Sequence, residues 1–338
     1  MGRPGCRPGR HLDSGLVRQV LKQWVDPFVV ALVATMVLGL VVPVPAEVQR
    51  VVDAVADVAV AVLFLVYGMR LSTSEVWAGL KNVRLQGGIL AATYVVFPLV
   101  GLVVAWAVTP WVGEPLAAGI LFSSLLPSTV QSSVAFTSVA RGNIAGAICG
   151  ATVSNVVGMV VTPLLVLWFM SSSGATSGLS GLREVLLHLL VPFVVGQLLQ
   201  PFVGSWIRAR RWLTLSVDRG TILVVVFGAV AAATSAGVWA GISGWTILGL
   251  VGVSGVILAI MLAVTWWGGA GLRLGVEDRI ALLMCGSKKS LATGLPMAAV
   301  LFPVAVAGTV AVPVIVFHQL QLIVCAVLAR RLALRDAA

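Results

Sequence analysis

The sequence predicts an all-α polytopic membrane protein of ten transmembrane helices, arranged as two inverted five-helix repeats. Apolar residues make up 59% of the 338, charged residues only 10%, and the mean hydropathy is +1.06, far from the balance of a soluble domain. The apolar residues fall in runs of about 20, the length that crosses a bilayer. Two of these runs, at comparable places in the two halves, are interrupted by polar residues, which is typical of a transporter's binding site.

The ten apolar runs divide into two groups of five. A Ser/Gly-rich linker over 171–182 separates a repeat over 23–170 from a repeat over 183–330, and an odd number of spans in each makes the repeats inverted. Residues 1–22 are predicted to be a disordered basic cytoplasmic tail, and 331–338 a second cytoplasmic tail. The predicted spans are 27–44, 52–69, 87–109, 116–140 (broken), 143–169, 183–203, 215–236, 244–268, 278–302 (broken) and 304–328.

The distribution of positive charge supports this number of spans and predicts their orientation. With the N-terminus in the cytoplasm, 18 of the 22 lysines and arginines fall in cytoplasmic segments, and only Arg50 and Arg183 fall outside. Cytoplasmic loops of membrane proteins carry such an excess of Lys and Arg. We therefore expect both termini in the cytoplasm and the chain in the lipid bilayer of a cell (inner) membrane. The net charge of +10 reflects this topology, and no nucleic-acid partner is expected.

The first interrupted span carries Pro127 and a dense cluster of hydroxyl groups. Proline removes a backbone donor and obstructs the preceding turn, so the first half-helix is expected to end there. Ser128 and Gln131 stand in capping-box spacing for the second half-helix, whose N-terminal N–H groups suit an anionic group. For any single hydroxyl, bonding to backbone at a proline kink is an open alternative. The predicted site residues here are Ser128, Thr129, Gln131, Ser132 and Ser133, with Asn155 of the next span.

The second interrupted span completes the predicted site with Ser287, Lys288, Lys289 and Ser290. An ionisable residue inside a span costs about 2.5 to 3.5 kcal/mol on insertion scales, so it usually faces a cavity or a partner. A cytoplasmic loop is the alternative, but losing this span would place the C-terminal arginines outside. We expect the lysines beside the C-terminal end of this span's own first half-helix, where carbonyls favour a cation. A fixed ammonium could there replace a metal ion, and which lysine faces the cavity is left open.

Several segments together resemble the bile acid:sodium symporter superfamily, closest to its SBF-like branch. They are Leu126-Pro-Ser-Thr-Val-Gln-Ser-Ser, Ala140-Arg-Gly-Asn143, Val161-Thr-Pro-Leu-Leu165 and Cys285-Gly-Ser-Lys-Lys-Ser-Leu-Ala-Thr-Gly-Leu-Pro296. The resemblance covers residues 28–330 and implies a panel domain and a core domain, with broken helices 4 and 9 crossing in the core. It implies secondary active transport of organic anions by alternating access, with Ser132 and Ser133 in the sodium and substrate region.

The chain departs from the family pattern at the coupling ion. Where sodium-coupled members carry a glutamate in the ninth span, this sequence has Ser287 and two lysines, and hydroxyl ligands of the fifth span are replaced by Ala147 and Ala151. Exchanging a carboxylate for an ammonium changes the local charge by two units, enough to disfavour a nearby sodium ion. We predict a carrier of a small organic anion with no bound cofactor or metal. Sodium or a proton is left open as the coupling ion, and a carrier that works without sodium, proton-linked or facilitative, is the hypothesis that the lysines suggest. The oligomeric state is left open.

Two other function classes are weighed against a carrier. A non-transporting membrane regulator would keep the same fold while acting on another transport system, and it remains the alternative function. An enzyme is not expected, because the sequence contains no HExxH motif and no acidic metal-binding cluster, and its 12 acidic residues lie mostly near span ends.

Overall fold

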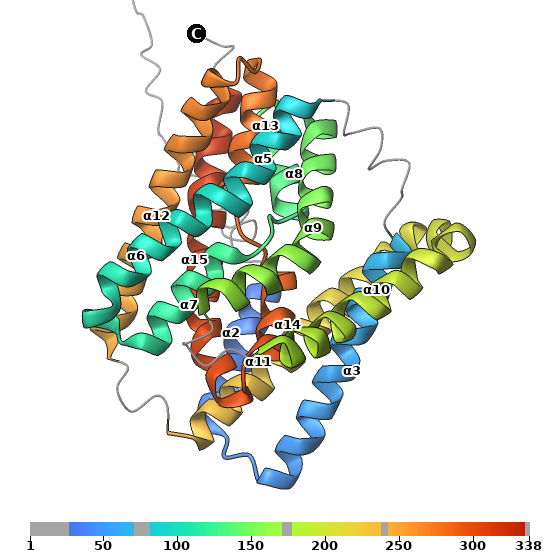
Figure 1. The fold of residues 1–338 in the computed structure, drawn as a ribbon, viewed down its shortest axis with the longest axis vertical. Coiled ribbons are helices and arrows are strands. Elements are labelled where there is room, and N and C mark those ends of the chain that lie inside the picture. The colour runs from blue at the N-terminus through green and yellow to red at the C-terminus, as the bar shows by residue number, and fades with distance from the viewer. Residues whose placement is uncertain (1–26, 71–81, 171–177, 238–242, 335–338) are drawn as a thin grey trace, which may run out of the picture.

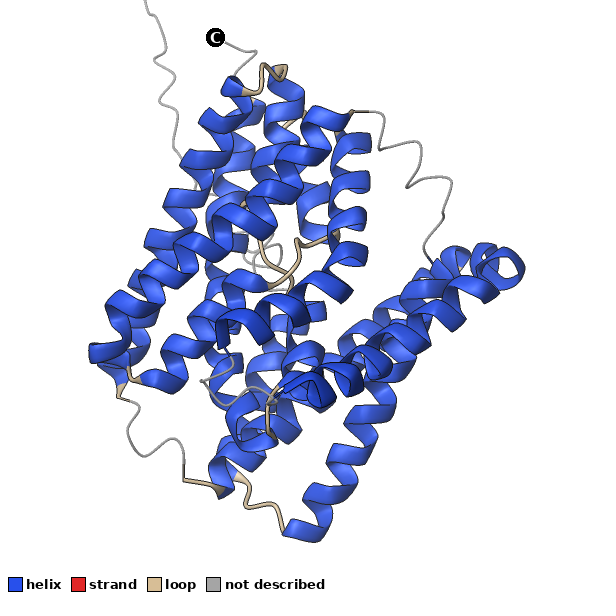
Figure 2. Cartoon of the chain, viewed as in Figure 1, coloured by secondary structure: helices blue, strands red, loops and turns tan. Residues whose placement is uncertain are grey.

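The computed structural model describes residues 27–70, 82–170, 178–237 and 243–334, and all regular structure in these ranges is helical (Figures 1 and 2). The predicted N-terminal tail, most of the linker and the last four residues lie outside these ranges. The elements are α2 (Pro27–Val41), α3 (Ala46–Arg70), α5 (Val83–Ala91), the π-helix η1 (Ala92–Val96), α6 (Phe97–Val112), α7 (Glu114–Leu125), α8 (Gln131–Val139), α9 (Ile144–Met170), α10 (Gly178–Ala209), α11 (Arg211–Ser235), α12 (Gly244–Gly271), α13 (Val276–Gly286), α14 (Leu291–Leu301) and α15 (Val304–Ala333).

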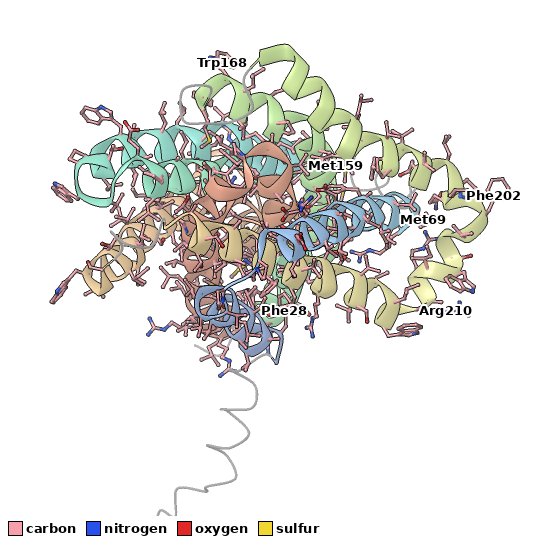
Figure 3. All side chains as sticks on the ribbon, turned by 90° about the horizontal axis from the view of Figure 1, so that it is seen from below. Phe28, Met69, Met159, Trp168, Phe202 and Arg210 are labelled. Carbon is pink, nitrogen blue, oxygen red and sulfur yellow. The ribbon has the colours of Figure 1, made fainter. Side chains whose placement is uncertain are left out.

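The helices have the length and surface of an integral membrane protein. Seven helices within the described ranges are long and apolar enough to cross a membrane, α5, η1 and α6 together counting as one. Large tryptophans near helix ends are exposed: Trp111 by 85%, Trp168 by 80% and Trp245 by 81%, and Trp168 projects from the molecule in Figure 3. Such aromatic residues are enriched where a membrane meets water. The exposed surface is therefore one that faces lipid.

The interruptions lie where the sequence places them. Helix α7 ends at Leu125 and α8 begins at Gln131, so residues 126–130 form the first break. Helix α13 ends at Gly286 and α14 begins at Leu291, so residues 287–290 form the second break. One feature was not expected, the single π-helical turn η1 inside the third predicted span.

Helix α3 packs closely along α10 and α11 (Figure 1). Glycines allow the close approach of α3 and α10, because a Cβ built on Gly68 would lie 2.1 Å from the Phe193 carbonyl oxygen, and one on Gly196 2.1 Å from that of Leu65. Small residues at such crossings bring helix backbones together in membranes. The remaining helices enclose the breaks: α13 packs against α5, α8, α9 and α12, while α7 packs against α6 and α15. This packing places both breaks in the interior.

Candidate functional site

The two breaks meet directly. The Ser290 N–H donates a hydrogen bond of 2.9 Å to the Pro127 carbonyl, joining the main chains of the two interruptions. The first break and the start of α8 also bond the carbonyl end of α13: the Ser128 hydroxyl donates to the Cys285 carbonyl at 2.5 Å, and the Ser133 hydroxyl of α8 to the Met284 carbonyl at 2.8 Å. Backbone groups freed at membrane depth must find partners inside the protein. One hydroxyl of the first break and one of α8 therefore complete the end of α13.

The predicted capping box at the start of α8 is wrong. Val130 is the N-cap of α8 and makes no side-chain cap, and the Gln131 side chain is exposed. The Ser128 hydroxyl is engaged by the Cys285 carbonyl instead, because that acceptor is buried and has no helical donor. A side-chain cap is found at the other second half-helix, α14, where the Ser290 hydroxyl accepts from the Thr293 N–H at 3.3 Å.

The Thr129 hydroxyl of the first break forms a connected cluster with two hydroxyls at the start of α8. The Thr129 hydroxyl lies 2.7 Å from that of Ser132 and 2.8 Å from that of Ser133. Helix α9 fixes the main chain of the break, since the Asn155 amide donates to the Ser128 carbonyl at 2.8 Å and the Ser154 hydroxyl accepts from the Ser128 N–H at 3.1 Å. The main chain of the first break is therefore held by α9, while the hydroxyls of Ser128 and Ser133 bond α13.

Lys289 has a buried ammonium group that bonds two main-chain carbonyls. Its Nζ lies 2.6 Å from the Leu126 carbonyl oxygen and 2.9 Å from that of Thr93, and 4.2 Å from the centre of the Phe97 ring. Leu126 is the C-cap of α7, and the carbonyl end of a helix favours positive charge. Lys289 therefore sits at the end of α7, the other broken helix. The expectation that it lies at the end of α13 is wrong, because residues 287–290 are not helical and the Lys289 side chain reaches the last carbonyl of α7 instead.

The Thr93 carbonyl is available because of the π-helix. The Phe97 N–H bonds the Ala92 carbonyl, one residue further back than in an α-helix, and the next residue, Pro98, has no N–H to offer. The Thr93 carbonyl thus loses both of its main-chain donors and accepts from Lys289 instead. The sequence reveals only the proline; the register change that frees the carbonyl comes from the π-helical turn.

Gln321 of α15 holds the main chain of Lys289 by two hydrogen bonds. Its Oε1 accepts from the Lys289 N–H at 2.8 Å, and its Nε2 donates to the Lys289 carbonyl at 2.8 Å. This pairing fixes the orientation of the amide, so the second hydrogen on Nε2 is left for His318 Nδ1 at 2.8 Å. Gln321 is fully buried and is not among the residues that the sequence predicts for the site.

Lys288 projects towards α8. Its Nζ lies 3.5 Å from the Ser132 hydroxyl and 4.5 Å from the centre of the Phe136 ring, and the residue is 0% exposed. The Ser287 hydroxyl returns to the Leu283 carbonyl of its own helix. The structure thus gathers the predicted residues around one crossing, with the exception of the exposed Gln131.

The turn Ala140–Asn143 helps to hold the crossing in place. Asn143 and Asn82 both donate to the Asp278 carboxylate, at 2.7 and 2.8 Å, and each asparagine also caps its own helix by accepting from a backbone N–H. The starts of α5, α9 and α13 are therefore joined at one carboxylate. Negative charge is favourable at the N-termini of helices.

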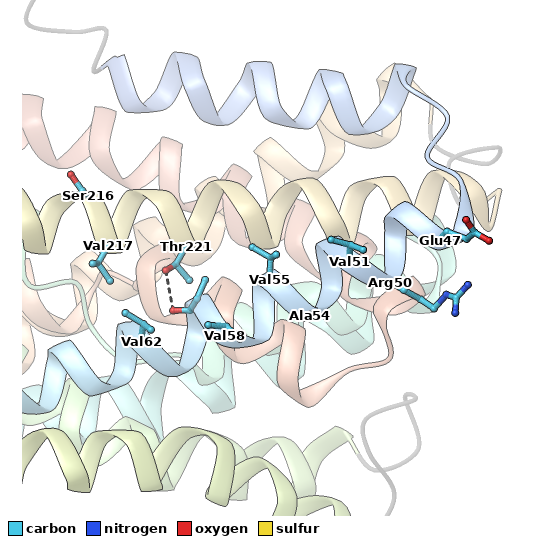
Figure 4. Close-up of a pocket in the computed structure, with 11 residues that line it drawn as sticks. Glu47, Arg50, Val51, Ala54, Val55, Val58, Val62, Ser216, Val217 and Thr221 are labelled. Carbon is cyan, nitrogen blue, oxygen red and sulfur yellow. Dashed lines mark hydrogen bonds between the residues drawn. The ribbon is translucent and has the colours of Figure 1, made fainter.

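A separate groove runs between α3 and α11 (Figure 4). It has a volume of about 870 Å³ and apolar walls formed mainly by Val51, Val55, Val58 and Val62. None of the predicted site residues lines this groove, so it does not belong to the crossing of the two breaks.

Comparison with known proteins places the chain in a family. Residues 26–334 match the model of the SBF-like CPA transporter family. An uncharacterized protein of Pseudomonas aeruginosa is 43% identical over 316 residues, which cover 93% of this chain and 95% of that protein. "Putative symporter YfeH" of Escherichia coli is 39% identical over 90% of this chain and 92% of its own length.

More distant relatives connect the chain to the bile acid:sodium symporter superfamily. Sodium/bile acid cotransporter 7-A of Xenopus laevis is 24% identical over 323 residues, covering 93% of this chain and 92% of that protein. The match to the family model, over residues 26–334, includes all the helices described above and both breaks. The chain therefore belongs to the SBF-like CPA transporter family, and it is an integral membrane transporter rather than an enzyme.

Proposed function

We propose that the protein is a secondary transporter that carries a small organic anion by alternating access and does not depend on sodium. The ten spans form two inverted five-helix repeats in an inner cell membrane, with both termini in the cytoplasm. The placement of the breaks supports this arrangement, since each lies in the fourth span of its half and each supplies donors to the last carbonyls of the other broken helix. Such reciprocal crossing favours a site reached alternately from the two sides.

The observation that carries sodium independence is the position of the Lys289 ammonium. It occupies the carbonyls of Leu126 and Thr93, the type of oxygen ligand that a sodium ion would use, and the residue is only 1% exposed. A second cation a few ångströms away would be repelled strongly where water does not screen the charges. The ammonium therefore serves as a permanent cation at the crossing, and a proton takes the role of coupling ion if one is needed.

Uptake into reconstituted vesicles tests this proposal. The purified protein in proteoliposomes would be offered extracted anionic metabolites and, because the name of the Xenopus relative suggests it, a bile acid. Accumulation would be compared with protein-free vesicles, in sodium and in choline buffers. We expect an anion to accumulate at the same rate in both buffers, and strict sodium dependence would contradict the role given to Lys289.

A matched variant sharpens the test. Lys289→Ala empties the position at the two carbonyls without adding a new charge. We expect sodium to stabilise this variant against thermal unfolding while leaving the wild-type protein unchanged. Stabilisation of the wild type by sodium to the same extent would mean that its sodium site lies elsewhere. If no anion accumulates while the protein remains folded, the regulator function gains support.

A further inference from the structure

The two adjacent lysines differ in how well their ammonium groups are bonded. An ammonium offers three N–H donors. Lys289 places its group on two carbonyls, at 2.6 and 2.9 Å. Within the described part of the chain, Lys288 has a single hydrogen-bond acceptor, the Ser132 hydroxyl, at the long distance of 3.5 Å. Lys288 therefore keeps donors that no described side chain uses.

Burial makes the lack of hydrogen-bond acceptors around the Lys288 ammonium unfavourable. The residue is 0% exposed, and burying a charge without acceptors is unfavourable unless a partner is provided. Asp218 is the only buried acidic side chain in the described ranges. Its carboxylate lies 3.9 Å from the Arg70 guanidinium and is therefore paired with Arg70 rather than with Lys288. An anion beside this ammonium would supply the acceptor that the described side chains do not.

The groups around Lys288 have the composition of an anion site. The hydroxyls of Ser132 and Thr129 lie 2.7 Å apart and can rotate to donate outward. Ser132 is half-buried and its neighbour Gln131 is exposed, so this side of the cluster reaches towards the surface. The Phe136 ring, 4.5 Å from Nζ, offers an apolar wall beside the charge.

We infer that Lys288, rather than Lys289, binds the substrate, and that the substrate is a monoanion with an apolar body, such as a carboxylate. One ammonium balances one negative charge, whereas a phosphate dianion is better matched by the paired donors of arginine. Lys289 is already bonded to two helix carbonyls and acts as the fixed cation. This inference rests on the proposed transport function and names the group that recognises the cargo.

Anion-dependent thermal stability of the purified full-length protein in lipid nanodiscs tests the inference. The probes are benzoate, chloride and inorganic phosphate, each as its choline salt, and neutral benzamide. We expect benzoate to raise the melting temperature in a saturable manner, and chloride, phosphate and benzamide to do so much less. Lys288→Gln should weaken benzoate binding at least about ten-fold, because a charged hydrogen bond is lost, and Lys288→Arg should retain part of it.

Milder variants keep the test decisive if Lys288→Gln does not fold. Ser132→Ala should weaken benzoate binding about three-fold to ten-fold. Ser138→Ala is the matched control, since Ser138 lies on the same helix with an exposed side chain, and it should bind benzoate as the wild type does. Unchanged benzoate binding in a folded Lys288→Gln variant, unchanged binding in Ser132→Ala where Lys288→Gln does not fold, or equal stabilisation by phosphate or benzamide would overturn the inference.

The same variants separate this inference from the transport proposal. Uptake of an organic anion that is unaffected by Lys288→Gln would refute the role of Lys288 and leave the transport function standing. Benzoate binding that requires Lys288, together with no uptake of any anion, would support the anion site and contradict transport.

Discussion

The two breaks solve the same problem with different chemistry. The last carbonyls of α13 accept hydrogen bonds from neutral hydroxyls, those of Ser128 and Ser133. At the end of α7, the Thr162 hydroxyl bonds the Leu125 carbonyl, but the Leu126 carbonyl accepts from the ammonium of Lys289. Either donor satisfies a carbonyl away from water. The difference is that the second break also brings a formal charge into the interior.

This difference is the basis of the proposal that the crossing binds an anion. A hydroxyl can donate or accept, so the first break can adapt to what approaches it. An ammonium only donates, and its field acts on any ion nearby whether or not its hydrogen bonds are satisfied. The two lysines at the crossing have no ion-pair partner among the described buried side chains. Three substitutions test how much each kind of donor contributes.

The largest effect is expected at the charged donor. Lys289→Met removes the ammonium and leaves the buried carbonyls of Thr93 and Leu126 without that donor. Each unsatisfied group costs about 1 to 3 kcal/mol, so we expect the free energy of unfolding to fall by about 3 kcal/mol or more. Chemical denaturation in detergent micelles measures this. A value within experimental error of the wild type would show that the ammonium is not the principal donor at the end of α7.

An intermediate effect is expected where the second break is held by an amide. Gln321→Leu leaves the Lys289 N–H without its acceptor in the interior and removes the shorter of the two contacts to the Lys289 carbonyl, which keeps only His318 Nδ1 at 3.3 Å. We expect a loss of about 2 to 4 kcal/mol in the free energy of unfolding, measured in the same way. Gln319→Leu on the same helix is the control, since Gln319 is half-buried and we expect its replacement to change stability little. Equal losses in the two variants would mean that the paired bonds to Lys289 contribute nothing specific.

The smallest effect is expected at the neutral donors. Ser128→Ala removes one hydroxyl from the Cys285 carbonyl, at a cost of about 1 to 2 kcal/mol. The melting temperature, compared with that of Ser138→Ala, measures the loss. A greater loss in Ser128→Ala than in Lys289→Met would reverse the comparison and make the first break the stronger support of the crossing.

Much of this arrangement was predictable from the sequence because apolar runs and their interruptions are local features. Pro127 and the paired lysines indicate both breaks, and the helices α7, α8, α13 and α14 end or begin at them. The partners of the broken ends were not predictable. The Lys289 ammonium meets a carbonyl 163 residues away, and such a meeting depends on packing rather than on spacing.

The incorrect and missing predictions have the same origin. Ser128 and Gln131 have the spacing of a capping box, yet α13 supplies a nearer acceptor for Ser128. Gln321 resembles any other polar residue in an apolar span until the fold places it against the main chain of Lys289. The free Thr93 carbonyl requires both Pro98 and a π-helical turn, and only the proline is visible in the sequence.

The reciprocal bonding of the breaks bears on how the chain is made. The Leu126 carbonyl receives its donor only after a residue 163 positions later has been synthesised, which takes roughly 10 to 30 seconds at about 5 to 20 residues per second. During that time the first half in the bilayer holds an unfinished helix end. The crossing of the two breaks can therefore form only late in synthesis, after the second half has entered the bilayer.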